Sequence, residues 1–237
     1  MYTIVWFIII TSLYFPVIYY TNTNIYYFVY IILLIIGEYF ISLDASKSLC
    51  GSNQWVTAFL VSFVPWILVF GVISMLLKIF PGWLIPFSNT FGYIVISFTG
   101  LSKLIKEIFK PSIENPTPGM KGLQETLAYI YSDQSLIINE ITVDNFDNFW
   151  NKVSPLFNNN VKNNIDLKTR LFNLIRIKFL IAEYIWYLLT GVLVASISYN
   201  YLINSKCEIN VEDMQKRAKD IKVKTKENEN KKYYSYE

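Results

Sequence analysis

The sequence predicts an all-α, multi-pass transmembrane protein with about five spans, a small helical extramembrane unit and a charged C-terminal tail. Apolar residues make up 53% of the 237 residues and charged residues 16%, whereas soluble domains carry about 25% charged residues. The charges are placed unevenly, because residues 1–102 contain only Glu38, Asp44, Lys47 and Lys78. Apolar runs of about 20 residues, enough to cross a hydrocarbon core of roughly 30 Å, fill this N-terminal transmembrane region.

The first three spans are read directly from these runs. Residues 3–20 and 25–43 are separated by the short polar link "TNTN", so they form an antiparallel hairpin. Residues 55–80 form the third run, which begins at Trp55 and is long enough to cross with a tilt or with a kink at Pro65.

The fourth span, residues 83–101, is interrupted by polar and helix-breaking residues in "FPGWLIPFSNTFGY". We predict that it crosses the membrane, with Trp83 as an interfacial anchor and Pro86 as a kink near the start. A re-entrant loop and an interfacial turn are the alternatives, and both need the freed backbone groups to be satisfied inside protein or by water. A ligand site is a third reading, but a Trp at this position is typical of a membrane anchor.

The two cysteines distinguish the crossing from the re-entrant alternative. With five spans, Cys50 and Cys207 lie on opposite sides of the membrane and cannot pair. With a re-entrant segment only four segments cross, both cysteines share a side, and a disulfide then requires Cα atoms within about 7 Å.

Residues 103–170 have a soluble character and form the predicted extramembrane unit. The segment "ITVDNFDNFWNKVSPLF" begins with Thr142 or Asp144 as N-cap and spaces Phe146, Phe149 and Trp150 along one helical face. We expect Trp150 to be buried. A unit of this size has little core of its own, so we expect it to lie against the membrane surface or a partner.

Residues 171–204 form the last span, and residues 205–237 form a charged tail that is predicted to be partly disordered. Because the last run is long and strongly apolar, we expect the extramembrane unit and the tail to lie on opposite sides of the membrane. More Lys and Arg residues flank the extramembrane unit than the start of the tail, which favours a cytosolic extramembrane unit.

Two carboxylates lie inside apolar runs, Glu38 and Glu183. Such residues are candidates for a proton or ion pathway. Each is only a few residues from the polar end of its run, which favours an interfacial or interhelical structural role. Glu183 could pair with Arg176 or Lys178, although neither has ideal helical spacing.

Small residues suggest close helix packing in the fourth span. Ser88 and Gly92 are four residues apart, a spacing that lets helices approach closely, but Ile96 interrupts the pattern before Gly100.

The sequence contains no pattern typical of an enzyme. It has no histidine, no glycine-rich phosphate loop and only two cysteines, so we predict no catalytic residues, no cofactor and no metal. The net charge of +3 comes from interspersed signs, so a nucleic-acid partner is not expected.

Several segments together resemble an uncharacterised multi-pass membrane protein family of nucleocytoplasmic large DNA viruses. These are "CGSNQWVTAF", "PWILVFGV", "FPGWLIPFSNTFGY", "LIINEITVDNFDNFW" and "YIWYLLTGVLVASISYNYLINSKC", within roughly residues 50–207. The resemblance implies a minor structural protein in the internal membrane of a giant-virus virion, without enzymatic activity. Its implied partners are the lipid bilayer and capsid or other virion membrane proteins.

Two other functions remain open from the residues alone. A transporter or channel would place the broken segment and Glu38 or Glu183 along its pathway. An organelle-encoded subunit of a respiratory membrane complex would fit the high content of Ile, Asn, Tyr and Phe.

Overall fold

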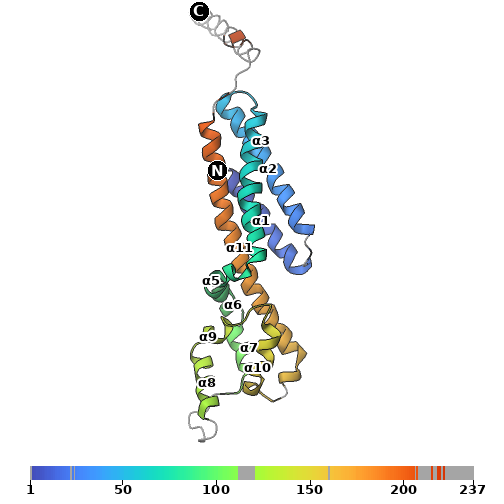
Figure 1. The fold of residues 1–237 in the computed structure, drawn as a ribbon, viewed down its shortest axis with the longest axis vertical. Coiled ribbons are helices and arrows are strands. Elements are labelled where there is room, and N and C mark those ends of the chain that lie inside the picture. Colours follow the sequence, from blue (N-terminus) through green and yellow to red (C-terminus); the bar gives the residue numbers. More distant parts are fainter. Residues whose placement is uncertain are drawn as a thin grey trace, which may run out of the picture. The chain divides into compact units, whose positions relative to one another are not determined.

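The computed structural model describes residues 2–111 and 121–205 except 22, 24 and 160, together with Cys207 and isolated residues of the tail (215, 218, 219 and 221). Most of the predicted disordered tail therefore lies outside the described residues. Within the described part the chain is all-α, as predicted, and its only β feature is an isolated bridge between Phe109 and Phe157. Figure 1 shows the helices coloured by their position in the sequence, from blue at the N-terminus to red at the C-terminus.

Among the described residues, four helices are long and apolar enough to cross a membrane, so the chain is a multi-pass membrane protein. They are α1 (Tyr2–Thr21), α2 (Ile25–Cys50), the run Trp55–Ile79, and α11 (Ile165–Asn204). The run Trp55–Ile79 comprises α3 (Trp55–Val64), the π-helix η1 (Pro65–Gly71) and α4 (Val72–Ile79). The π-helix begins at Pro65, whose missing N–H and ring disturb the regular i→i−4 ladder.

The fourth predicted span is a series of short helical pieces. It comprises η2 (Pro81–Leu84), α5 (Ile85–Phe87), the π-helix η3 (Ser88–Gly92) and α6 (Tyr93–Phe98). Gly100 then adopts a left-handed conformation with φ +90°, and α7 (Leu101–Ile108) leaves at 85° to the preceding segment. The chain has five candidate spans only if this bent pair is counted as one.

The chain divides into two compact units, and their borders pass through continuous helices. Unit 1 contains Met1–Ile10, Asn24–Gly71 and Gly191–Glu237, and unit 2 contains Thr11–Thr23 and Val72–Thr190. In unit 1, α2 packs along α3, and the Phe7 ring contacts both Trp66 and Phe70, with ring centroids 5.4 and 5.9 Å apart. Many apolar side chains of unit 1 point outward, as expected for helices surrounded by lipid.

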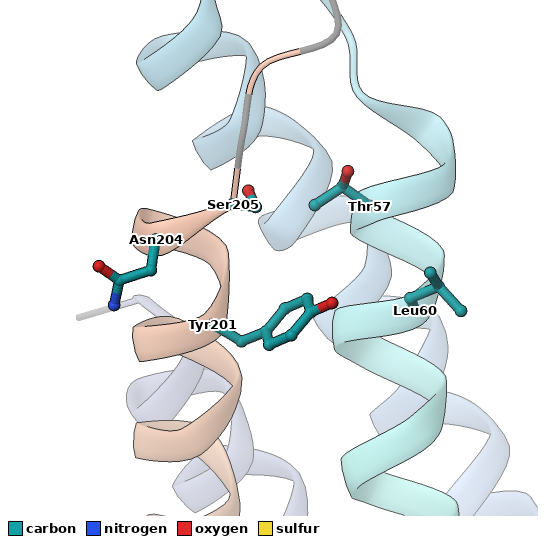
Figure 2. Close-up of a pocket in the computed structure, with 5 residues that line it drawn as sticks. All are labelled: Thr57, Leu60, Tyr201, Asn204 and Ser205. Carbon is teal, nitrogen blue, oxygen red and sulfur yellow. The ribbon is translucent and has the colours of Figure 1, made fainter.

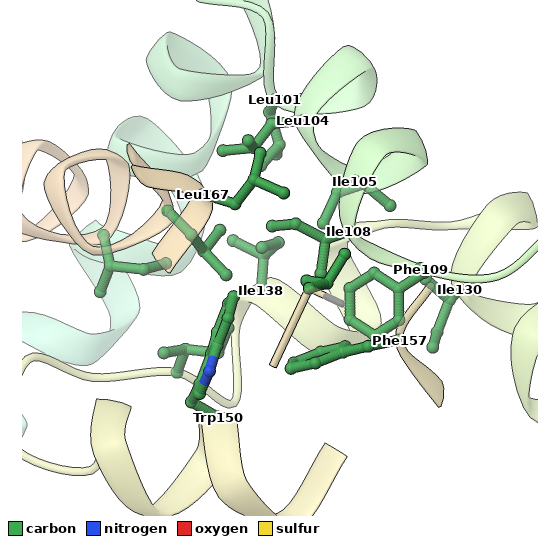
Figure 3. Packing of buried hydrophobic residues seen from close by; sticks show 14 of the residues in the cluster. Leu101, Leu104, Ile105, Ile108, Phe109, Ile130, Ile138, Trp150, Phe157 and Leu167 are labelled. Atoms are coloured by element: carbon green, nitrogen blue, oxygen red, sulfur yellow. The ribbon is translucent and has the colours of Figure 1, made fainter. Parts of the chain in front are cut away.

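Unit 2 contains a folded core built mainly from the segment between α6 and α11. The remaining helices of this segment are α8 (Lys121–Ser132), α9 (Ser135–Ile138), α10 (Phe146–Val153), η5 (Ser154–Leu156) and η6 (Val161–Asn163). Figure 3 shows side chains from α7, α8, α9, α10 and α11 converging on one interior. The expectation that this segment has little core of its own is therefore wrong, because α7 and the first turns of α11 supply additional apolar faces.

Candidate functional site

A disulfide joins Cys50 at the end of α2 to Cys207 just after α11, with the two Cα atoms 5.5 Å apart. The helix α2 continues through Cys50 and stops at Gly51, whose φ of 67° is the left-handed conformation that commonly ends a helix. The expectation that these cysteines lie on opposite sides of the membrane and never pair is wrong. Crosslinked residues lie on the same side, so the bond constrains the membrane topology.

A cavity of about 360 Å³ lies in unit 1 near the end of α11. Figure 2 shows the Tyr201 ring directed from α11 toward α3, where Thr57 and Leu60 line the opposite wall. Ser205 also lines it, but its hydroxyl donates to the Leu202 carbonyl at 2.7 Å. The described lining side chains carry hydroxyl, amide and apolar groups.

Glu38 is buried between helices and not at the membrane surface. Its side chain is 1% exposed, and its Oε1 atom has no hydrogen-bond partner among the described residues. One helical turn away, Ser62 of α3 donates to Ser42 of α2 at 3.2 Å. Because the helices are antiparallel, this register places Trp66 at the level of Glu38, and the Trp66 Nε1 donor is also unpaired in the described part of the chain.

A second cavity in unit 1, of about 630 Å³, borders Ser42, one turn from Glu38. Its other polar lining groups include Thr3, Asp44, Ser48 and Ser198. The Ser198 hydroxyl is buried and has no partner among the described residues. This arrangement brings polar groups toward Glu38 from the end of the helices that carries the disulfide.

In unit 2, aromatic side chains hold the broken segment against α11. Trp83 is 46% exposed, and its ring lies 5.6 Å from Phe80 and 6.3 Å from Trp186. Phe87 meets Trp186 edge-on at 5.3 Å. Pro86 has no N–H to donate to the helical ladder, and the Thr90 hydroxyl donates to the Pro86 carbonyl at 2.7 Å.

Gly92 packs closely against the backbone of α11. A Cβ atom at Gly92 would overlap the Lys178 carbonyl oxygen and lie 3.0 Å from the Lys178 Cγ. Lys178 is itself fully buried, and its ammonium donates to the Ile138 carbonyl at 2.9 Å. Gly92 therefore allows the broken segment to pack against α11 at Lys178. Lys178 in turn bonds to α9 through the Ile138 carbonyl.

Glu183 has a different partner from the two predicted ones. Arg176 donates to the Tyr19 carbonyl at 2.6 Å and Lys178 to Ile138, and neither forms an ion pair with Glu183 in the described part of the chain. The Lys78 ammonium of α4 and the Tyr187 hydroxyl instead act on the Glu183 carboxyl. Tyr187 is four residues further along the same helix, whereas Lys78 is distant in the sequence, and its spacing gave no signal.

The remaining predicted residues have packing or hinge roles. Trp55 is 55% exposed at the start of α3, with its ring 6.5 Å from Tyr39. Gly100 forms the sharp bend before α7.

The three aromatic residues of α10 pack in the core of unit 2. Phe146 and Trp150 are buried, and Phe149 is partly buried. The helix begins at Phe146 with Asn145 as its N-cap, and the predicted Thr142 accepts a hydrogen bond from the Asn145 backbone N–H at 3.1 Å.

Polar residues that sequence reasoning missed fix the loops around this core. Asn158 donates to the carbonyls of Glu107 and Phe109 at 3.1 and 2.9 Å, which satisfies the C-terminal end of α7. Tyr131 donates to the Phe109 carbonyl at 3.0 Å, and burial raises the pKa of its hydroxyl. An isolated Asn in a polar loop gives no sequence signal of this kind.

Among the described residues, no group of three or more metal-ligating side chains comes together. No family model, curated protein or solved structure matches the chain.

Proposed function

We propose that this chain is a structural membrane protein of a large DNA virus particle, in which it links the internal membrane to capsid or core components. The viral assignment rests on the resemblance of residues 50–207 to the giant-virus membrane protein family. The proposed link between the membrane and the capsid or core components rests on the structure of α11.

The observation that carries the proposal is the double role of α11. Leu167, Leu171 and Ile175 belong to the core of unit 2, and the same unbroken helix continues as an apolar span to Asn204. A helix of 40 residues is about 60 Å long at 1.5 Å per residue, about twice the hydrocarbon thickness of roughly 30 Å. A partner bound to the helical unit (residues 103–170) would therefore be linked to the membrane by the same helix that forms part of that unit's core.

The disulfide supports a four-crossing topology. Since Cys50 and Cys207 share a side, the chain between them crosses an even number of times. The run Trp55–Ile79 and α11 account for two crossings, so the segment Pro81–Phe98 enters and leaves from the same side. The helical unit then lies on the side opposite the disulfide, together with the turn between α1 and α2.

The orientation follows from two independent chemical arguments. Disulfides form and persist in oxidising compartments, which favours a non-cytosolic face for Cys50 and Cys207. Lys and Arg residues flank the helical unit on the other side, and such positive charge favours the cytosolic face.

Mass spectrometry of purified particles, combined with lysine crosslinking, tests this proposal. We expect the chain in the particles, with crosslinks from Lys121, Lys152 or Lys168 of the helical unit to capsid or core proteins. A chain absent from particles, or one that co-purifies with respiratory complexes, would contradict the viral structural role. Protease added to sealed vesicles should cut the helical unit and spare the tail, or the reverse.

A transporter is the second candidate, and it is favoured by one specific observation. The buried Glu38 carboxyl lies one turn from a cavity whose mainly apolar lining includes several hydroxyl groups and Asp44, and its Oε1 atom has no partner among the described residues. Reconstituted vesicles containing the wild-type chain would show proton or cation flux that Glu38→Gln abolishes, if this function exists. The structural role predicts no flux from either protein.

A further inference from the structure

We propose that a groove between α1 and α11 binds one anionic phospholipid, with its phosphate at Arg176 and an acyl chain along the groove. The groove has a volume of about 430 Å³ and lies wholly within unit 2. Its walls include Phe15, Pro16 and Tyr19 of α1, and Ile177, Ile181 and Tyr184 of α11. This lipid site rests on the proposed cytosolic orientation of the helical unit and not on the viral assignment.

Arg176 is fixed beside Tyr19, which lines one end of the groove. Its guanidinium donates to the Tyr19 carbonyl at 2.6 Å and lies over the Tyr19 ring, 4.9 Å from the ring centroid. No carboxylate in the described part of the chain forms an ion pair with it. A guanidinium has five N–H donors in a planar fork that matches phosphate oxygens, so donors remain for a phosphate.

The groove has the direction that a lipid in one leaflet requires. From Tyr19 to Ser12 the wall rises by seven residues, or about 10 Å along the helix axis. Since α1 spans Tyr2–Thr21, Tyr19 lies near its end and Ser12 near its middle. A lipid with its phosphate at Arg176 would therefore have its chain directed toward the middle of the bilayer.

The inner end of the groove is closed by polar groups that satisfy each other. The hydroxyls of Ser12 and Tyr184 are 2.9 Å apart, and Tyr184 meets the buried Phe15 edge-on at 5.2 Å. Because these two hydroxyls bond to each other, the rest of the wall is predominantly apolar and suits an acyl chain. The charged Arg176 lies near the outer end only.

The charge pattern of the chain selects an anionic headgroup. Arg176 lies on the side of the membrane that carries the helical unit, which the positively charged flanks assign to the cytosolic face. That leaflet is the one enriched in anionic lipids, and basic pockets between membrane helices on that face bind their headgroups. Phosphatidylglycerol is a suitable probe, because it carries a net negative charge and differs from phosphatidylcholine only in its headgroup.

The test uses native mass spectrometry of the detergent-solubilised full chain with phosphatidylglycerol or phosphatidylcholine at equal concentration. Both lipids carry the phosphate, but the choline cation of phosphatidylcholine offsets its charge near Arg176. Wild type should therefore retain phosphatidylglycerol at least about tenfold better, which corresponds to about 1.4 kcal/mol. Arg176→Gln should lose this preference. Arg170→Gln is the matched control, because Arg170 already pairs with Glu107 and Asp166 and does not line the groove.

A second variant tests the acyl-chain part of the site separately from the headgroup part. It also keeps the proposal testable if Arg176→Gln does not fold. Ile181→Trp fills the groove without changing the charge and should also reduce phosphatidylglycerol retention. Retention unchanged in either folded variant, or equally reduced in Arg170→Gln, would overturn the proposal. Displacement of the lipid by an equal concentration of inorganic phosphate would overturn it too, because the site would then recognise free phosphate.

Discussion

At the scale of single residues, Trp150 contributes most to the core of unit 2. It is 2% exposed, its ring lies 4.5 Å from Phe157, and its indole N–H donates to the Lys162 carbonyl at 3.4 Å. Replacing a buried Trp with Ala typically costs about 3–5 kcal/mol. Trp150→Ala should therefore lower the free energy of unfolding strongly, and Phe149→Ala, which affects a partly buried ring, should lower it less. Thermal unfolding in detergent measures both, and equal effects would contradict the assigned burial.

Gly92 permits a close approach of the broken segment to α11. In Gly92→Ala the new methyl group would overlap the Lys178 carbonyl, so the backbone must shift. Such overpacking typically costs about 1–3 kcal/mol. Gly82→Ala is a matched control in the same segment, since no atom lies within 4 Å of the added methyl group. A lower melting temperature is expected for Gly92→Ala alone, and an unchanged one would mean that the two helices do not meet there.

Asp133 provides a small pH-dependent contribution to stability. Hydrogen bonds from the Ser135 hydroxyl and backbone N–H lower the pKa of the Asp133 carboxyl below its ordinary value. Because the folded-state pKa is the lower one, this contribution is complete above the unfolded pKa and is lost as the pH falls through the folded pKa.

Asp133→Asn should therefore be slightly less stable than wild type at neutral pH. This difference should vanish on acidification well below the ordinary Asp value of about 3.9. Melting temperatures of the two proteins across this range measure the effect. A difference that persists at the lowest pH would show that the side-chain charge is not its source.

At the scale of secondary-structure elements, Gly100 determines the bend between α6 and α7. Its φ of +90° is a conformation that costs roughly 1–2 kcal/mol for a residue with a side chain. Gly100→Ala should therefore be destabilising, whereas Gly122→Ala inside α8 should be stabilising by about 0.5–1 kcal/mol, because it has open space and a helical backbone. Circular dichroism melts of the two variants should shift in opposite directions, and a shared direction would exclude a left-handed Gly100.

The long helices could be predicted from the sequence, because the length of an apolar run depends only on the residues of that run. The four long apolar runs, the hairpin of α1 and α2 and the irregular helix at Pro65 all follow from local composition. The end of α2 was missed by seven residues. The polar segment "DASKSLC" reads as a loop, but it remains helical until Gly51 terminates it.

At the scale of the whole molecule, long-range contacts determined what the sequence could not predict. Two such features join residues that are distant in the chain: the Cys50–Cys207 bond and the influence of Lys78 on Glu183. A third, the burial of Glu38, depends on packing between helices. Hydropathy measures neither sequence-distant contacts nor packing between helices. Hydropathy alone therefore could not decide whether residues 83–101 cross the membrane, whereas the cysteine pairing constrains that choice.

The core of unit 2 was missed for a related reason. The predicted extramembrane unit ended at residue 170, but the core continues into Leu171 and Ile175, which were assigned to the last span. Only their joint packing with α8, α9 and α10 produces a buried interior.

The most direct test of the four-crossing topology is thiol labelling in sealed vesicles of one orientation. After mild reduction, a membrane-impermeant maleimide is added from outside, and Cys50→Ser and Cys207→Ser variants report on each remaining cysteine separately. The account predicts that both cysteines are labelled, or that both become labelled only after the vesicles are permeabilised. It also predicts a faster-migrating, disulfide-bonded wild type on non-reducing gels. Labelling of one cysteine and not the other in intact vesicles would contradict it and show that residues 83–101 cross the membrane.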